Sequence, residues 1–423
     1  MREKRSFVVT LGIAVLALAA CGDPMPSSGG DLLWTLQFGT SEADQGAAVA
    51  VADDGRIAVA GETRGDLGGP SQGGKDAFVR LLDGDRAVVW TRQFGSPVDD
   101  VVQGLAFHPG GGLVVAGLTY GDLGGANAGG YDAFVRRLDT DGQAAWTHQF
   151  GSIAHDVIDA LAIDADGRVV VAGTTRGVLQ GTGFGTGDAF VRQLEAGGGH
   201  RWTRQFGSAG EDFALGVAAG PGGRVAVGGG TAGDLADPGA APRGHHDAFV
   251  QVFDADGDVL WTHQFGTDLD DHVFSVAFAA DGRLFAFGVT DGALAAPNAG
   301  ERDVFVRAYG PAGEVLWTRQ FGSAGSDYAS GVVVAASDDV VVDGTTTGAL
   351  AGDSAGDSDA FVARIGPTGA ITWIRQFGTA AAEHTRAVAI GPAGEALVVG
   401  TTGGALVGAS SGGDDVFLRA YGP

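Results

Sequence analysis

Short apolar runs separated by turn-forming residues repeat along the whole chain. Within residues 103–152, the runs 104–108, 113–119, 132–138 and 144–150 are rich in Val, Leu, Phe and Trp, and Gly, Asp and Pro lie between them. None of these runs has the 3.6-residue spacing of an amphipathic helix. The pattern predicts four antiparallel β-strands per unit, the first two joined by a tight turn.

The second run of each unit is almost entirely apolar, as in Val114–Ala116 and Val169–Ala172. A strand with apolar residues on both faces is typical of burial between two layers. Sheets stacked face to face around an axis provide such burial. A solenoid would instead need capping units at its ends, and the sequence shows none.

Each unit ends in a close copy of the segment Trp-Thr-Arg-Gln-Phe-Gly. The seven tryptophans of the chain each open one copy, at steps of 56 residues except for one step of 59, and they are Trp34, Trp90, Trp146, Trp202, Trp261, Trp317 and Trp373. A fixed period of this length indicates a repeat array. The first copy is a fourth strand, and the chain ends on a third strand, 415–421. We therefore expect an all-β, seven-bladed β-propeller over residues 31–423, with four antiparallel strands per blade, in which the strand around Trp34 completes the last blade.

The repeat also resembles a known family. Its elements are Gly-x-Thr-x-Gly-x-Leu, a glycine-rich loop, Asp-Ala-Phe-Val, Asp-x-x-Gly and Trp. Together they resemble the SBBP β-propeller repeats of exported bacterial proteins, over residues 31–423. The resemblance implies the fold and export, and it offers no catalytic residues.

The N-terminus reads as a leader. A basic start is followed by an apolar run from Phe7 to Ala20, which is shorter than the roughly 20 residues needed to span a bilayer. Such a run is typical of a secretory signal. The segment Leu-Ala-Ala-Cys that ends at Cys21 resembles the bacterial lipoprotein signal, which implies cleavage before Cys21 and lipid attachment to it. A plain secretory signal cut after Ala20 is the alternative.

We accordingly divide the chain into a signal peptide (1–20), a lipidated cysteine with a flexible tether (21–30) and the propeller (31–423). Gly22 follows the cysteine, and by the lipoprotein family's sorting rule this favours the outer membrane, facing the periplasm or the cell surface. The chain has one cysteine, so it contains no internal disulfide.

The composition is acidic, with 51 Asp and Glu against 26 Lys and Arg and a net charge of −25. This field repels phosphate backbones, so nucleic acid is excluded as a partner. Cations or basic surfaces fit better. A soluble surface that carries charge is the simpler interpretation.

Several polar residues recur in every unit and are expected to be structural. An Asp opens each third strand, opposite the Thr that closes the second, and we expect it to bond to that Thr or to the backbone; these are Asp76, Asp132, Asp188, Asp247, Asp303, Asp359 and Asp415. The Arg two residues after Trp, as in Arg92 and Arg204, is expected to pack between the aromatic rings.

A second acidic series suggests a site. Ten residues after each Trp lie Asp44, Asp100, Asp156, Asp212, Asp271, Asp327 and Glu383. We expect these carboxylates to surround one mouth of the central channel, where crowded oxygen ligands suit Ca²⁺. Loop capping and solvated charge are the alternative interpretation. His155, His272 and His384 flank the same series in three non-adjacent blades and offer a weaker hypothesis of a transition-metal site.

One loop breaks the symmetry, because residues 234–246 contain three extra residues. Function concentrates in loops held by rigid scaffolds, so Asp237, Arg243, His245 and His246 are candidate binding residues. A tolerated insertion explains the same observation.

The sequence thus predicts a non-enzymatic binding or scaffolding module of the cell envelope, monomeric and with an unidentified protein or glycan partner. The alternatives are a propeller enzyme (a hydrolase, a lyase or a quinone-dependent dehydrogenase) and an outer-membrane assembly factor. We find no set of nucleophile, base and orienting residue in the repeats.

Overall fold

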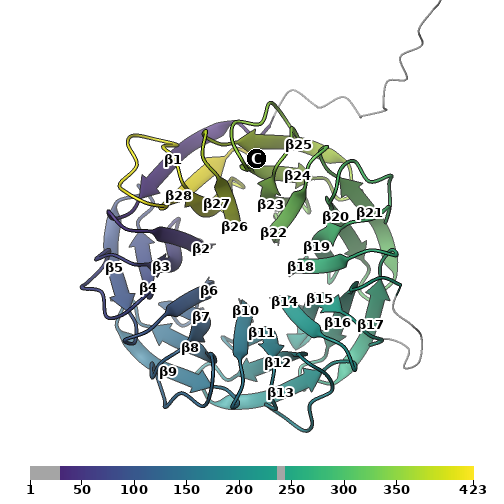
Figure 1. Ribbon diagram of the computed structural model, residues 1–423, viewed down its shortest axis with the longest axis horizontal. Helices are drawn as coiled ribbons and strands as arrows, with labels where there is room; N and C mark the ends of the chain where they lie inside the picture. The colour runs from purple at the N-terminus through teal and green to yellow at the C-terminus, as the bar shows by residue number, and fades with distance from the viewer. Residues whose placement is uncertain (1–28, 236–242) are drawn as a thin grey trace, which may run out of the picture.

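The computed structural model describes residues 29–235 and 243–423. They form seven sheets of four antiparallel strands, arranged as blades around a central channel (Figure 1). The repeat analysis predicted this seven-bladed β-propeller, and the prediction is confirmed. Cys21, the leader and Asp237 lie outside the described residues.

The strands fall into four concentric rows. The innermost row is β2 (Asp44–Val51), β6 (Asp100–Phe107), β10 (Asp156–Ile163), β14 (Asp212–Ala219), β18 (Asp271–Phe278), β22 (Asp327–Val334) and β26 (Glu383–Ile390). The second row is β3 (Ile57–Thr63), β7 (Leu113–Thr119), β11 (Val169–Thr175), β15 (Val225–Thr231), β19 (Leu284–Thr290), β23 (Val340–Thr346) and β27 (Ala396–Thr402). The third row is β4 (Asp76–Leu82), β8 (Asp132–Leu138), β12 (Asp188–Leu194), β16 (Asp247–Phe253), β20 (Asp303–Tyr309), β24 (Asp359–Ile365) and β28 (Asp415–Tyr421). The outermost row is β5 (Val88–Phe94), β9 (Ala144–Phe150), β13 (His200–Phe206), β17 (Val259–Phe265), β21 (Val315–Phe321), β25 (Ile371–Phe377) and β1 (Leu32–Phe38).

We number the blades 1 to 7 from the one that begins with β2. A single-turn 3₁₀ helix, η1 (Pro221–Gly223), joins β14 to β15. Among the described residues no helix is long and apolar enough to cross a membrane.

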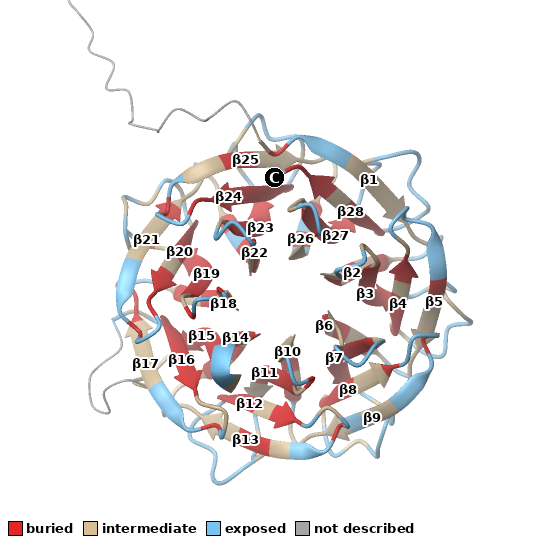
Figure 2. Cartoon of the chain, turned by 180° about the vertical axis from the view of Figure 1, so that it is seen from behind, coloured by how far each residue is buried: buried red, intermediate tan, exposed pale blue. Residues whose placement is uncertain are grey.

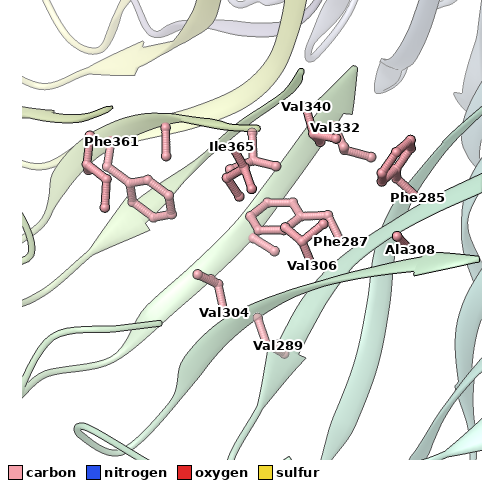
Figure 3. Close-up of a cluster of buried hydrophobic side chains, with 14 of the residues drawn as sticks. Phe285, Phe287, Val289, Val304, Val306, Ala308, Val332, Val340, Phe361 and Ile365 are labelled. Atoms are coloured by element: carbon pink, nitrogen blue, oxygen red, sulfur yellow. The ribbon is translucent and has the colours of Figure 1, made fainter. Parts of the chain in front are cut away.

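The hydrophobic core lies between the blades. Every residue of β3, β7, β15, β19, β23 and β27 is buried, as the apolar runs of the second strands predicted. Between blades 5 and 6, Phe287 and Val306 of one sheet pack with Val340 and Phe361 of the next (Figure 3). Figure 2 shows the same pattern around the ring, where buried residues fill the middle strands and exposed residues follow the outer rim.

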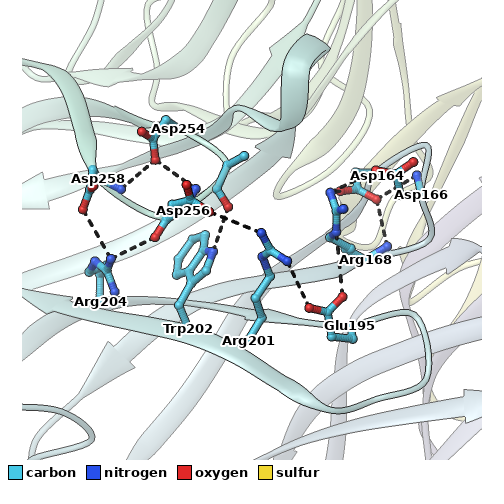
Figure 4. Close-up of polar contacts among 11 residues, drawn as sticks. Asp164, Asp166, Arg168, Glu195, Arg201, Trp202, Arg204, Asp254, Asp256 and Asp258 are labelled. Carbon is cyan, nitrogen blue, oxygen red and sulfur yellow. Dashed lines mark hydrogen bonds and ion pairs between the residues drawn. The ribbon is translucent and has the colours of Figure 1, made fainter.

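Adjacent blades are also joined at their outer strands (Figure 4). In blade 3, Trp202 donates from Nε1 to the carbonyl of Ala255 in the next blade at 3.2 Å. Arg204 donates to the carbonyls of Asp256 and Gly257 at 2.9 and 2.8 Å. Gly257 has φ +81°, and a Cβ there would lie 2.9 Å from the indole, so this turn position requires glycine. The expected contact of the arginine with the aromatic ring is present, at 5.6 Å.

The termini meet in the last blade, where β1 pairs with β28. The tether was expected to extend to residue 30, but Gly29 and Gly30 belong to the ring. Arg375 donates to the carbonyl of Gly30 at 3.0 Å and also to that of Gly29, as Arg204 does to the turn of the neighbouring blade. Gly422 donates from its backbone N to the carbonyl of Asp31 at 2.8 Å. The two chain ends therefore form, without a covalent link, the turn that the other blades form with continuous chain.

This closure predicts a sensitive position at Gly30, whose φ is +73° and whose Cβ would lie 2.7 Å from Trp373. Gly30→Val should lower the free energy of unfolding by about 1–3 kcal/mol, because the left-handed backbone is strained with a β-branched residue and the indole must move. Chemical denaturation measures the change. Gly197→Val is the control, because it lies in open space; equal effects of the two substitutions would contradict the proposed closure.

Candidate functional site

The seven acids that open the innermost strands surround the channel but do not face it. All seven have an exposed fraction of 0%. Asp156 accepts hydrogen bonds from the backbone N and the hydroxyl of Ser152 at 2.5 and 2.8 Å, and from the Thr175 hydroxyl at 2.5 Å. Burial raises the pKa of Asp100 and of Asp212, although each accepts equivalent hydrogen bonds from a serine and a threonine, which lower it.

The predicted ring of open, cation-binding carboxylates at Asp44, Asp100, Asp156, Asp212, Asp271, Asp327 and Glu383 is therefore wrong. The spacing placed the acids at the correct end of the strands. It could not show that each side chain folds back to cap the loop before it, which is the alternative interpretation given above. The Ca²⁺ hypothesis rested on this ring. Across residues 29–235 and 243–423, no group of three His, Cys, Asp or Glu side chains is arranged to hold a metal ion.

The acids of the third strands are buried structural groups, as expected. Asp303 accepts a hydrogen bond from Gln320 Nε2 at 3.0 Å and one from the backbone N of Ala299 at 3.1 Å. The expected backbone bond is confirmed, but the side-chain partner is this glutamine rather than the threonine opposite. Gln320 also accepts from three backbone amides of the loop after β19, among them Leu294 and Ala295, at 2.9 Å each.

The candidate loop residues are split between two places. Arg243 lies beside a pocket of about 690 Å³ whose other lining residues include Phe265 and Arg307. Equivalent residues two blades further on, Phe377 and Arg419, line a similar pocket of about 330 Å³. The first pocket is thus an enlarged form of a feature that the scaffold repeats. His245 is exposed.

His246 packs in an aromatic cluster with Phe213 and His272, with ring centres 5.2–5.4 Å apart. Burial, followed by the nearby His246, lowers the pKa of His272 to about 4. His155 lies in another blade, where Tyr131 packs on it at 5.1 Å. The histidines of the metal hypothesis are therefore not brought together.

Two columns of residues on the innermost strands do face the channel. Along β2, β6, β10, β14 and β18 the first and third residues are buried and the second and fourth are more accessible, so the latter two point into the lumen. The second residues are Gln45, Val101, Val157, Phe213, His272, Tyr328 and His384. The fourth residues are Ala47, Gln103, Asp159, Leu215, Phe274, Ser330 and Arg386. No residue type recurs in the fourth-residue column, in contrast to the buried positions beside it.

Both columns meet in a pocket of about 500 Å³ at the channel mouth, between blades 6 and 7. We call it the mouth pocket, and its lining residues are Phe274, Tyr328, Ala329, Ser330, Thr345, Thr347, Ser358, His384, Thr385 and Arg386. Phe274, Ser330 and Arg386 also line the narrow part of the channel, so the two spaces are continuous. The mouth pocket combines two aromatic walls, several hydroxyl groups and a guanidinium.

The mouth pocket lies beside Ser358, which is smaller than the residues that blades 1, 2 and 4 carry at this position; blade 3 carries Gly187 there. Ser358 occupies the position of Lys75 in blade 1, which bonds to Glu62 at 3.0 Å. The same position holds Tyr131 in blade 2 and His246 in blade 4, and both rings pack in aromatic clusters. In these blades the corresponding space is filled.

A buried polar cluster supports the base of the mouth pocket. Asp343 stands in an otherwise apolar strand and is fully buried, with Oδ1 accepting from the Gly331 backbone N at 2.8 Å. Its Oδ2 has no hydrogen-bond partner within the described structure. The Ser330 hydroxyl donates to the Thr385 carbonyl at 3.0 Å, and Thr385 N donates to the Thr345 hydroxyl at 3.3 Å.

This cluster alters the local strand pairing. In the other blades the pairing of the first two strands leaves one residue of the inner strand unpaired. In blade 6 the pair Ala329–Gly344 is followed by the pair Val332–Val342, so two residues of the inner strand and Asp343 of the second strand are unpaired. Asp343 lies opposite the bulge and bonds to the amide that the ladder leaves free. The sequence analysis missed it, although an Asp within the run Val-Val-Val-Asp-Gly was a visible departure from the repeat.

Burial also raises the pKa of two carboxyls that the sequence analysis did not single out. The pKa of Asp343 rises to about 7, because desolvation outweighs its hydrogen bonds, and that of Asp159 rises to about 7 for the same reason. Asp159 is only half-buried by accessible area, yet protein surrounds it in the narrow channel.

Comparisons with known proteins show the fold and little more. No family model matches the chain. Regulatory protein FlaEY of Caulobacter vibrioides is 29% identical over 185 residues, which is 40% of this chain and 18% of FlaEY. The chain thus matches only a small part of that relative's length.

Among solved structures, the polysaccharide lyase Uly1 is similar with 12% identity over 91% of each chain and a TM-score of 0.53. The Pan2 WD40 domain of Neurospora crassa has 9% identity over 94% of this chain and 96% of its own, with a TM-score of 0.50. A puromycin hydrolase variant has 14% identity over 86% of this chain and 51% of its own, with a TM-score of 0.50. These similarities show a β-propeller, a fold shared by enzymes and non-enzymes.

The glutamine network predicts a large loss on substitution. Gln320→Leu removes the partner of Asp303 and of the loop amides, and burying these unsatisfied groups should cost at least about 2 kcal/mol of unfolding free energy. Urea unfolding measures this cost. Gln180→Leu, at an exposed glutamine, should change stability little; a similar small effect at Gln320 would show that the network is not stabilising.

The buried Asp343 predicts a pH dependence. Its folded pKa lies near 7 and its ordinary value is 3.8, so the native state holds the proton more tightly, and stability declines as pH rises from about 4 to 7. Asp343→Asn, which retains an acceptor for Gly331, should therefore show a smaller loss of melting temperature between pH 5 and pH 8 than the parent protein. Asp141→Asn, at an exposed turn, should keep the parent's pH dependence. Parallel curves for Asp343→Asn and the parent would contradict the assignment.

Proposed function

We propose that this protein is an exported, lipid-anchored binding or scaffolding module of the bacterial cell envelope, and that it binds its partner at the mouth pocket. The observation that carries the proposal is the convergence of non-repeating residues. Buried positions repeat from blade to blade, whereas the channel-facing columns vary and bring Phe274, Tyr328, His384 and Arg386 to one pocket. A repeating scaffold whose variable residues line one concave surface is typical of a binding protein.

The envelope location rests on the leader, in which Leu-Ala-Ala-Cys resembles a lipoprotein signal, and on the resemblance to SBBP repeats. The glycine after Cys21 favours the outer membrane. A protein partner is preferred over a small molecule because the mouth pocket opens on the face that also carries the longest loops of the blades.

A propeller enzyme is the second candidate, because Tyr328, His384 and Arg386 line one pocket and some propellers of similar fold are enzymes. A nucleophile or base is normally oriented by hydrogen bonds within the site. His384 has no hydrogen bond to Ser330 or to a carboxylate among the described residues, so we prefer binding. An outer-membrane assembly factor would be one form of the scaffolding role.

The anchor predicts that Cys21→Ser releases the protein from membranes. In cells of the native host, the parent should fractionate with the outer membrane and the variant with the soluble periplasmic fraction. Retention of the variant in the membrane fraction would contradict lipid anchoring at this residue.

The mouth pocket predicts a position-specific partner. A photoreactive benzoylphenylalanine in place of Tyr328 should cross-link a discrete envelope component, and the same residue in place of Pro109, on the opposite face, should not. Ser358→Tyr fills the mouth pocket with the residue type that blade 2 carries at this position, so the scaffold should tolerate it, and it should abolish the cross-link. A product of equal yield from both positions, or one unaffected by Ser358→Tyr, would refute the proposed site.

A further inference from the structure

The arginine of the mouth pocket is available to a ligand. Arg386 is exposed, and it forms no hydrogen bond or ion pair with any described residue. Of the described residues that line the mouth pocket, it is the single Arg or Lys. By contrast, Arg302 in blade 5 forms a two-point ion pair with Asp291 at 2.6 and 3.0 Å.

Arg386 also acts on Glu62 of blade 1: burial raises the pKa of this carboxyl, and Lys75 and then Arg386 oppose the rise. That carboxylate already has a partner, because Lys75 bonds to it at 3.0 Å. Arg386 is therefore a cation in a partly enclosed space whose counter-charge is not supplied by the pocket. An anionic group on a ligand satisfies it, since guanidinium and carboxylate form paired, charge-assisted hydrogen bonds.

The remaining lining suits a carboxylate attached to an apolar or aromatic side chain. The Thr345 hydroxyl accepts from Thr385 N at 3.3 Å and has its own proton to donate, and the Ser358 hydroxyl has no hydrogen-bond partner among the described residues. The Ser330 hydroxyl already donates to the Thr385 carbonyl. Phe274 and Tyr328 supply apolar and aromatic walls. The volume of about 500 Å³ is within the range of specific ligand sites. The channel behind the mouth pocket is narrow, so a ligand enters from the mouth with one of its ends first.

The charge of the protein selects among anionic ligands. A net charge of −25 disfavours a polyanion such as an acidic polysaccharide, which would be repelled along its length. A neutral or basic polypeptide is not repelled, and every polypeptide ends in one carboxylate whatever its net charge. Capture of a chain terminus in a preformed pocket is an established mode of peptide recognition.

We propose that the mouth pocket binds the C-terminal residue of a partner polypeptide. Arg386 and the hydroxyls of Thr345 and Ser358 hold the terminal carboxylate, and Phe274 and Tyr328 contact the terminal side chain. This inference rests on the proposed function, because it names the class of partner for the same site.

The test uses the full chain purified in detergent and fluorescein-labelled hexapeptides with two lysines in the body and Phe, Tyr, Leu or Val at the C-terminus. Each peptide is prepared as the free acid and as the C-terminal amide. At least one free acid should bind at least about tenfold more tightly than its amide, because the amide removes a charge-assisted hydrogen bond. Arg386→Gln should abolish that difference and Arg386→Lys should retain part of it.

Two further variants control for indirect effects. Arg176→Gln, at an arginine of the same face in blade 3 that bonds to Glu211, should leave peptide affinity unchanged. Ser358→Tyr should weaken binding of acid and amide alike by occupying the mouth pocket. Equal affinity for acid and amide, or an unaltered preference in Arg386→Gln, would overturn the proposal.

A glucuronic acid disaccharide is included as a separate probe. If the disaccharide binds in a manner that depends on Arg386 and no peptide binds, the ligand is an acidic sugar rather than a chain terminus, and the proposal is overturned. Failure of all peptides would likewise overturn the proposal, even where the Tyr328 cross-link is obtained and the proposed function stands. If the Tyr328 cross-link also fails, the mouth pocket is not the binding site and the proposed function is refuted there as well.

Discussion

The structure depends on one hydrogen-bonded unit that each blade repeats. The glutamine of the outermost strand donates both to a glycine carbonyl after the second strand and to the Asp that opens the third, and the donors are Gln37, Gln93, Gln149, Gln205, Gln264, Gln320 and Gln376. Its side-chain oxygen accepts from amides of the same loop. One side chain therefore ties the outer edge of the blade to the loop that rises above the channel face. Buried polar groups persist only when they are satisfied, which explains why glutamine, aspartate and glycine recur together.

The glycine that follows this unit imposes a second constraint. A Cβ on Gly95 would lie 2.3 Å from Asp76 Oδ1 and 3.0 Å from Asp100 Oδ2, so the third-strand acid of one blade and the inner acid of the next approach across it. The acid pair, the glycine and the glutamine fix where the chain leaves one blade and enters the next. Because these positions hold the geometry in every blade, the channel-facing residues do not have to repeat and are free to differ. The mouth pocket is a result of that freedom.

The sequence predicted the architecture well because the physical signals repeat seven times. The apolar second strands, the period of the tryptophans and the split last blade together predicted the fold and its closure. The role of Gly29 and Gly30 was not predictable, since they resemble a flexible linker until Arg375 and Trp373 are seen to enclose them. The cation-π contacts between blades were missed for a similar reason. Arg80, for example, lies 4.1 Å from the ring of Phe38, and the two residues belong to different repeats.

The candidate site was harder to predict because acidic residues that recur in every repeat were interpreted as a binding site. The seven inner acids recurred and are structural, whereas Arg386, Ser358 and Asp343 attract notice only when aligned copies are searched for departures. Even then the consequence of Ser358 depends on what the other blades place in the same space, which requires coordinates. Departure from a structural repeat is therefore the signal that points to the proposed site in this protein.

The buried acids also change the meaning of the net charge. The fourteen carboxyl groups at the starts of the inner and third strands are all buried, with exposed fractions of 3% or less. They are part of the hydrogen-bonded scaffold, and removing them from the 51 acidic residues leaves 37 against 26 basic residues. The acids outside this scaffold therefore still outnumber the basic residues, so the outer surface is acidic. An acidic surface around the exposed guanidinium of Arg386 favours a partner that is basic or neutral overall and anionic at a single point, and it disfavours one that is anionic throughout.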